Sequence, residues 1–376
     1  GKVYEKTLAY IRLVDSSGSG IKDGVASYYD GSWHTLGNTG DDGIYLAQLD
    51  GKKTNLTFKM TLGGASNQKA QNLANDSFVL FQTKQVTFTL LNSTGNELEG
   101  TASYYDGSWH DFGNGKTGSS MELLPGTYPF KVGYLGAEVQ KSQNIGTDPD
   151  VVFQTVNVSF KLLDSSGKKE LPGKAYFYSK EWKEFGGGAT GSTMELLPTT
   201  YPFKVGYRDA EVQKSQNVGT NPDVVFQTVN VSFQLLDSNE NPLEGEAYFY
   251  SKDWKPFDDG TTGSTMELLP TTYPFKVGYL GATLQKSQNV GTDAKVVFKT
   301  VNVSFKLKNS FGLPLKGDAW FYAGSWQKFG MERREARWNC CRRPIPSGLN
   351  MTAQPTRSRR MSRPTPMWNS APVWLR

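Results

Sequence analysis

The first 330 residues contain no cysteine, because Cys340 and Cys341 both lie near the C-terminus. A disulfide framework is therefore excluded for most of the chain, and cysteine usage does not fix the redox compartment. No stretch approaches the roughly 18 consecutive apolar residues of a membrane-spanning helix, so we predict no transmembrane segment. The chain begins at Gly1 without a methionine or an apolar signal core. We therefore expect the natural N-terminus to be missing.

Histidine is almost absent, and the two that occur, His34 and His110, stand one each in two different copies of the word G-S-W-H. One histidine per copy cannot build a metal site. The chain also lacks a G-x-S-x-G elbow, an H-E-x-x-H motif, a phosphate-binding loop and a dinucleotide fingerprint. We predict that this chain is not an enzyme and needs no cofactor or metal.

Basic residues are scarce in the main part of the chain. The formal charge is +5, but residues 331–376 hold ten Arg and two Glu, a net of +8. Residues 1–330 keep 31 basic and 34 acidic side chains and are mildly acidic. This distribution argues against nucleic acid as a partner.

Glycine, tyrosine and phenylalanine are abundant instead, with 40, 18 and 21 copies, which favours short strands joined by many turns. The word F-Q-T or F-K-T recurs at a spacing of 72, 73 and 72 residues, ending at Thr83, Thr155, Thr228 and Thr300. We define the repeats by these ends: 7–83 (repeat 1, the most divergent), 84–155 (repeat 2), 156–228 (repeat 3), 229–300 (repeat 4) and 301–330 (the start of repeat 5).

Each repeat reads as about seven short strands, as repeat 3 illustrates. Its opening strand places Val158, Phe160 and Leu162 on one face, and a later strand does the same with Tyr201, Phe203 and Val205. An alternation of period two puts one face in a core and the other in water. We predict an all-β fold, a tandem array of seven-stranded antiparallel β-sandwiches of the transthyretin-like or immunoglobulin-like kind, followed by an unstructured C-terminal tail.

The closing strand of one repeat runs into the opening strand of the next with no Gly, Pro or Ser spacer, as between Thr228 and Val229. Flexible linkers have a different composition. We expect neighbouring repeats to pack on one another in a stiff, extended array. The alternative is a short turn hidden at each join.

The repeat pattern stops after Gly330, and residues 331–376 read as the product of a shifted frame. The word W-N-C-C at residues 338–341 must be encoded TGG AAY TGY TGY, and regrouping by one base gives Met, Leu or Val followed by Glu, Leu and Leu. The next residues permit P-T-T-Y-P-F, the continuation seen after Met194 and Met266. We predict that the tail has no fold and that correcting one base near Gly330 restores a fifth repeat. The alternative is a genuine basic tail that binds acidic partners.

Three words carry a resemblance to known families: L-L-D-S-S-G at 162–167, L-L-P-G-T-Y at 123–128 and L-L-P-T-T-Y at 196–201. Their order resembles the transthyretin-like (prealbumin-like) repeats of bacterial surface proteins, namely Cna B-type and carboxypeptidase regulatory-like domains. The resemblance covers residues 7–330 and implies an extracellular or cell-surface location. It also implies a Lys to Asn/Asp cross-link promoted by a buried Glu. No Glu follows Tyr201 at the corresponding place, so we expect no cross-link.

Two recurring residue types remain as candidate sites. A tryptophan recurs once per repeat and could stack on sugar rings, or it could cover a sandwich edge beside Phe185 and its equivalents. These are Trp33, Trp109, Trp182, Trp254 and Trp326. A glutamate recurs in the word M-E-L-L, and its strand parity predicts a solvent-side position. These are Glu122, Glu195 and Glu267.

We favour a structural stalk or spacer as the function. A multivalent adhesin that binds glycan or a cell-surface protein through the tryptophans is one alternative. Accessory modules of a secreted enzyme are another.

Overall fold

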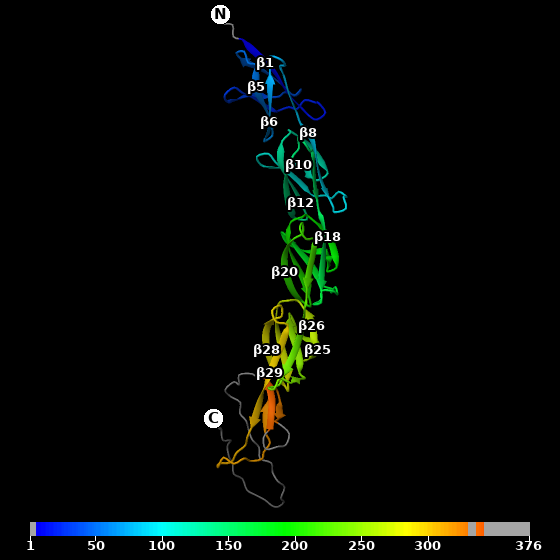
Figure 1. The fold of residues 1–376 in the computed structure, drawn as a ribbon, viewed down its shortest axis with the longest axis vertical. Helices are drawn as coiled ribbons and strands as arrows, with labels where there is room; N and C mark the ends of the chain where they lie inside the picture. Colours follow the sequence, from blue (N-terminus) through cyan, green and yellow to red (C-terminus); the bar gives the residue numbers. More distant parts are fainter. Residues whose placement is uncertain (1–4, 330–335, 342–376) are drawn as a thin grey trace, which may run out of the picture. The chain divides into compact units, whose positions relative to one another are not determined.

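The computed structural model describes residues 5–329 and the backbone of residues 336–341. The chain divides into two units, residues 1–228 and 229–376, which are treated separately below. Strands build every repeat, and the described residues contain no helix that could cross a membrane (Figure 1).

The first unit contains three repeats of seven strands each. The strands of repeat 1 are β1 (Lys6–Val14), β2 (Val25–Tyr29), β3 (Trp33–Asn38), β4 (Ile44–Asp50), β5 (Asn55–Leu62), β6 (Ala65–Asn72) and β7 (Phe78–Gln82). Those of repeat 2 are β8 (Lys84–Leu91), β9 (Thr101–Tyr105), β10 (Trp109–Lys116), β11 (Ser119–Leu123), β12 (Thr127–Tyr134), β13 (Ala137–Asn144) and β14 (Asp150–Gln154). Those of repeat 3 are β15 (Val156–Leu163), β16 (Lys174–Ser179), β17 (Glu181–Ala189), β18 (Ser192–Leu196), β19 (Thr200–Tyr207), β20 (Ala210–Asn217) and β21 (Asp223–Gln227).

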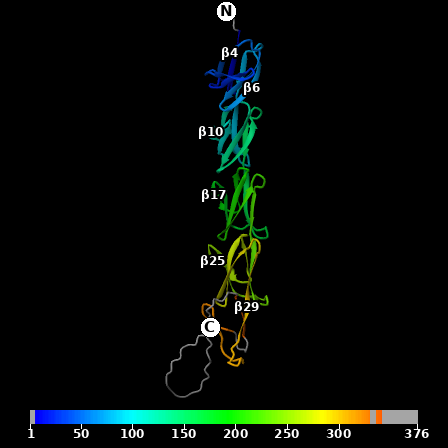
Figure 2. The same cartoon turned by 90° about the vertical axis from the view of Figure 1, so that its left-hand side faces the viewer.

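Each of these repeats is a sandwich of a three-stranded and a four-stranded sheet. In repeat 2 the strand orders are β11-β8-β14 and β10-β9-β12-β13, and repeats 1 and 3 repeat this pattern. All pairings are antiparallel except that between the opening and closing strands, which is parallel in each case. Because these two strands run the same way, the chain enters each sandwich at one end and leaves at the other. Within each repeat the strands lie along one common axis in the second view, some pointing one way and some the other (Figure 2).

The core of repeat 3 confirms the alternation expected from its sequence. Phe160, Leu162, Tyr201, Phe203 and Val205 are all buried. The ring of Phe160 lies 5.4 Å from that of Phe185 and 6.1 Å from that of Phe203, within the range of favourable aromatic pairs. The two inner faces therefore interlock through aromatic side chains, and the predicted all-β sandwich fold is confirmed.

The second unit contains repeat 4 and the described part of repeat 5. Repeat 4 is built from β22 (Val229–Leu236), β23 (Pro242–Leu243), β24 (Glu246–Ser251), β25 (Asp253–Thr261), β26 (Thr265–Leu268), β27 (Thr272–Tyr279), β28 (Ala282–Asn289) and β29 (Lys295–Phe305). Strand β29 is eleven residues long and continues into the repeat 5 segment, which adds β30 (Trp320–Tyr322) and β31 (Trp326–Lys328). A last strand, β32 (Ala336–Cys341), lies within residues 331–376. Strand β32 pairs antiparallel with β29.

The prediction of an unfolded tail concerned residues 331–376. Within that range only the backbone of β32 is described, and the remaining residues lie outside the described part of the chain. For those residues the prediction stays a prediction.

Candidate functional site

The five predicted tryptophans lie on the outer face of the sandwiches. Each one opens or nearly opens a strand at the edge of its sheet, as Trp109 does in β10. Trp109 is 40 % exposed, whereas Phe112, three residues later, is completely buried. A separation of three residues along a strand places two side chains on opposite faces. Trp33, Trp182 and Trp326 are similarly exposed, and Trp254 is half-buried.

Each tryptophan belongs to a small aromatic cluster with a tyrosine from the preceding strand. The ring of Tyr105 lies 5.5 Å from that of Trp109, with its edge toward the indole. The same pair recurs at 5.4 to 5.7 Å as Tyr29–Trp33, Tyr178–Trp182, Tyr250–Trp254 and Tyr322–Trp326. Both side chains of the pair are exposed in most repeats, so an aromatic surface recurs once per repeat.

A lysine ammonium lies over the indole in repeats 1 to 4. The Lys131 Nζ is 4.7 Å from the centre of the Trp109 ring, and Lys59, Lys204 and Lys276 take the same place over Trp33, Trp182 and Trp254 at 4.4 to 4.9 Å. These distances are within the range of a cation–π interaction. One face of each indole is thus covered by a cation, and only the remaining ring surface could stack on a sugar.

The two histidines lie next to carboxylates but do not form a catalytic relay. The His110 Nε2 is 3.0 Å from Asp106 Oδ1 and 2.8 Å from Ser108 Oγ. In a serine–histidine–aspartate relay the hydroxyl and the carboxylate contact opposite ring nitrogens. Here both contact the same nitrogen, so the imidazole cannot pass a proton between them. His34 repeats this arrangement with Asp30 and Ser32.

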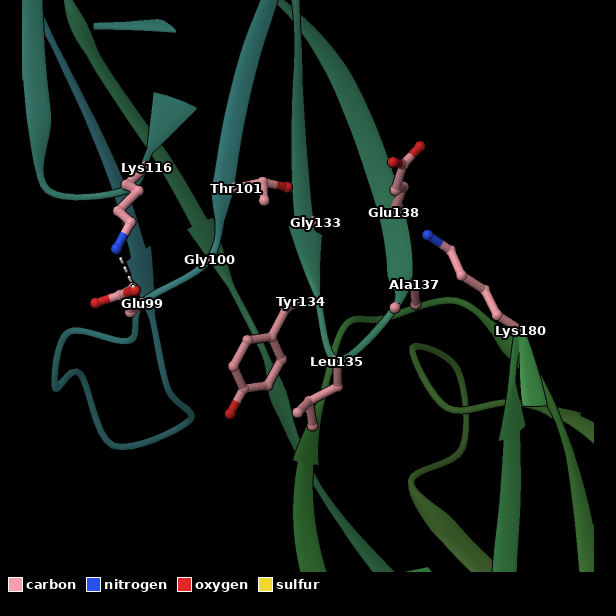
Figure 3. Close-up of a pocket in the computed structure, with 11 residues that line it drawn as sticks. Glu99, Gly100, Thr101, Lys116, Gly133, Tyr134, Leu135, Ala137, Glu138 and Lys180 are labelled. Atoms are coloured by element: carbon pink, nitrogen blue, oxygen red, sulfur yellow. Dashed lines mark hydrogen bonds and ion pairs between the residues drawn. The ribbon is translucent and has the colours of Figure 1, made fainter. Parts of the chain in front are cut away.

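A groove of about 420 Å³ lies beside the β12–β13 hairpin of repeat 2 (Figure 3). On one side Lys116 Nζ is 2.8 Å from Glu99 Oε1, and on the other side are Glu138 and Lys180, the latter from repeat 3. Charges of both signs line it, and the two carboxylates stand on opposite sides. The described part of the chain has no group of three or more His, Cys, Asp or Glu that could hold a metal.

The recurring glutamates, predicted to face solvent, join neighbouring repeats in the first unit instead. Glu122 of repeat 2 accepts hydrogen bonds from the backbone N–H of Ser16, at 3.1 Å, and from the hydroxyls of Ser16 and Thr83, all in repeat 1. The strand parity placed this side chain outside its own core correctly. It could not show that the preceding repeat covers that position.

Glu195 of repeat 3 makes the same contacts one repeat further along. It accepts a hydrogen bond from the Ser93 N–H at 3.1 Å and others from the hydroxyls of Ser93 and Thr155, all in repeat 2. Burial by itself would raise the pKa of Glu195, but these hydrogen bonds stabilise the carboxylate and hold the pKa below its ordinary value.

The second leucine of M-E-L-L packs into the core of the preceding repeat. Leu124 is 2 % exposed and belongs to the apolar cluster of repeat 1, whereas Leu123 belongs to that of repeat 2. Leu197 of repeat 3 likewise packs in the cluster of repeat 2. We call each glutamate together with this leucine the junction clasp: Glu122 with Leu124, and Glu195 with Leu197.

A hairpin contact accompanies the clasp between repeats 1 and 2. The Gly64 N–H, at the tip of the β5–β6 hairpin, donates to Asp106 Oδ2 at 3.0 Å. A Cβ at Gly64 would lie 1.7 Å from the Asp106 carbonyl oxygen, so only glycine permits this approach. In addition, the Asn67 side-chain amide donates to the Pro125 carbonyl oxygen at 3.0 Å.

The sequence carried a signal for this junction that the strand parity did not reveal. The glutamate of M-E-L-L, the serine after the first turn residue and the threonine that closes F-Q-T recur together in successive repeats. Thr83 and Thr155 are also buried although they stand at the joins between strands. Polar residues that recur at the ends of a repeat are candidates for contacts between repeats.

Comparison with known proteins gives similarity in structure only. No family model matches the chain, and no curated protein sequence matches it. The Bacillus anthracis TIE protein is 10% identical over 80% of this chain and 74% of its own, with a TM-score of 0.18. BcpA, the major pilin subunit of Bacillus cereus, is 11% identical over 79% of this chain and 99% of its own, with a TM-score of 0.19.

The pilus adhesin SpaC from Lactobacillus rhamnosus GG is 10% identical over 79% of this chain and 44% of its own, also with a TM-score of 0.19. At such TM-scores these similarities support no argument about function.

Proposed function

We propose that this chain is a non-catalytic structural repeat protein of the cell surface or extracellular space, in which repeats 1 to 3 are fixed against one another. The observation that carries this proposal is the junction clasp, which occurs at two successive junctions of the first unit. The glutamate accepts hydrogen bonds from three donors, and the leucine is buried in the neighbouring core. Together they restrict the rotation and tilt of one repeat relative to its neighbour. The one-residue joins between strands, such as Thr83 between β7 and β8, leave little free chain for bending.

Small-angle X-ray scattering on the full chain tests this function. We expect Glu195→Ala combined with Leu197→Ala to broaden the distribution of interatomic distances, because both halves of one junction clasp are removed. Glu211→Ala, which removes a carboxylate of the same repeat paired at 3.1 Å with Lys204, is the matched control and should leave the distribution unchanged. An unchanged distribution in the double variant, with its repeats still folded, would contradict the proposal.

The exposed aromatic clusters support a second candidate, namely weak, multivalent binding of glycan or a surface partner. Repetition would add affinity through effective concentration, although the lysine over each indole reduces the surface available for stacking. A glycan array probed with the full chain and with the Trp109→Ala, Trp182→Ala, Trp254→Ala variant separates the two candidates. Binding that depends on these three residues, with folding preserved, would favour the adhesin.

A further inference from the structure

The closing threonine of repeat 4 lacks the partner that its counterparts in repeats 1 and 2 have. Thr83 and Thr155 donate their hydroxyls to Glu122 and Glu195. Thr300 occupies the same place in the F-K-T word and is equally buried, at 3 % exposure. Its Oγ1 has no hydrogen-bond partner among the residues that the structure describes. A buried hydroxyl without a partner is unfavourable, which indicates that an acceptor belongs here.

The backbone of the second unit shows which position should supply that group. Strand β32 pairs with β29 so that residue 340 is opposite Val301 and residue 339 is opposite Asn302. In repeat 3 the same pairing sets Leu196 opposite Val156 and Glu195 opposite Asn157. Residue 339 therefore occupies the strand position of the clasp glutamate.

The codons give a separate indication of the same residue. Asn339 stands at this position, but the neighbouring reading frame of the W-N-C-C word requires glutamate there and leucine at 340 and 341. The codons of W-N-C-C and the unpaired hydroxyl of Thr300 are unrelated kinds of observation, so they are independent of each other. The register and the codons indicate the same position, and a glutamate there would supply the acceptor that Thr300 lacks among the described residues.

We propose that the end of repeat 4 around Thr300 is a receiving surface for the junction clasp of a fifth repeat, and that its partner is a glutamate at position 339. The surface binds an M-E-L-L word of the kind that repeats 2 and 3 present to their predecessors. This inference rests on the proposed function, in which such clasps join successive repeats.

A double-mutant cycle in the full chain tests the pairing. We expect Asn339→Glu to raise the hydrogen-exchange protection of the Val301 amide roughly tenfold, because a charged acceptor satisfies a buried donor. In a Thr300→Val background the same substitution should have no effect, and Asn339→Gln is the control for charge. Since the M-E-L-L word has a leucine of its own core and the clasp leucine after the glutamate, the triple variant Asn339→Glu, Cys340→Leu, Cys341→Leu is measured in parallel.

The proposal is supported if either glutamate variant raises the protection of the Val301 amide when Thr300 is present and does not raise it in the Thr300→Val background. If neither gains, or if both gain equally in the Thr300→Val background, the proposal is overturned. Glu195→Ala with Leu197→Ala, measured in the same chain, separates this outcome from the proposed function. If the junction between repeats 2 and 3 loosens in that variant but the Val301 amide gains no protection in the glutamate variants, only the proposed fifth clasp is refuted.

Discussion

Repeat 1 and repeat 2 have the same strand order but differ at the end where a preceding repeat would be contacted. Gln48 is paired with Leu8 in repeat 1 as Glu122 is paired with Gln85 in repeat 2. Two residues later, Asp50 stands where repeat 2 has the buried Leu124. Asp50 is exposed and forms an ion pair with Lys6. Repeat 1 therefore lacks both halves of the junction clasp on this side.

This difference separates two sets of residues that the sequence interleaves. One set fills the sandwich and is shared by all repeats, as Phe58 and Phe203 are at matched positions of β5 and β19. The other set joins repeats within the first unit, where it is present in repeats 2 and 3 and absent from repeat 1. Because the two sets alternate along the same strands, a single strand can keep its core residues while its outward residues change.

Removing a shared core residue should have the largest effect, and the effect should be the same in both kinds of repeat. Phe58→Ala in repeat 1 and Phe203→Ala in repeat 3 should each lower the free energy of unfolding of their repeat by about 3 to 5 kcal/mol. Both side chains are fully buried. Denaturant unfolding followed by hydrogen exchange in each repeat measures this. A small cost in repeat 1 alone would mean that the cores are not equivalent.

Removing the clasp leucine should act across the junction. Leu197→Ala should destabilise repeat 2 by roughly 2 to 4 kcal/mol, because the lost side chain fills the core of that repeat and not its own. Hydrogen exchange of the repeat 2 amides is the measurement. Leu46→Ala, at a position 47 % exposed in repeat 1, should change little. Loss of protection confined to repeat 3 would refute the assignment of Leu197.

The sequence could predict the cores but not the junctions. The alternation of Tyr201, Phe203 and Val205 fixes which side chains are buried, because a strand offers only two faces. The same rule predicts that Glu195 lies outside its own core, but it does not predict what covers that side chain. Whether an outward face meets water or a neighbouring repeat depends on contacts between distant segments, such as that of Glu195 with Ser93, 102 residues apart. For the same reason the sequence does not determine whether the tryptophans are exposed or cover a sandwich edge.

A substitution at the hairpin tip should disturb one junction without touching either core. Gly64→Ala would bring a Cβ into the Asp106 carbonyl oxygen, so the hairpin must shift at a cost of roughly 1 to 3 kcal/mol. The hydrogen-exchange protection of the Gly64 amide, which donates to Asp106, should fall. Gly40→Ala is the control, because its nearest contact would be an ordinary 3.4 Å. If Gly64→Ala and Gly40→Ala lower the protection of the Gly64 amide equally, the loss does not come from the contact between the hairpin and Asp106.

The smallest expected effect is a dependence of one junction on pH. The pKa of Glu195 is lower in the folded chain than in the unfolded chain, so its contribution to stability is present above the ordinary pKa of a glutamate, about 4.3. That contribution is lost as the pH falls through the lowered value. Because the carboxylate is only partly buried, we expect a change of about 1 kcal/mol or less.

Hydrogen-exchange protection of the Ser93 amide, corrected for intrinsic exchange, should therefore fall as the pH drops below the ordinary glutamate pKa of about 4.3, because the N–H bond to Glu195 weakens when the carboxylate is protonated. Glu195→Gln should lower this protection at neutral pH and remove its dependence on pH. The Leu13 amide of repeat 1, which donates to the Gly43 carbonyl oxygen at 2.8 Å, serves as the internal reference, because repeat 1 carries Gln48 in place of the glutamate. If the protection of the Ser93 amide falls with pH by the same amount in the Glu195→Gln variant, the effect comes from other carboxylates. The charge of the clasp glutamate would then not be part of the difference between repeat 1 and the repeats that follow it.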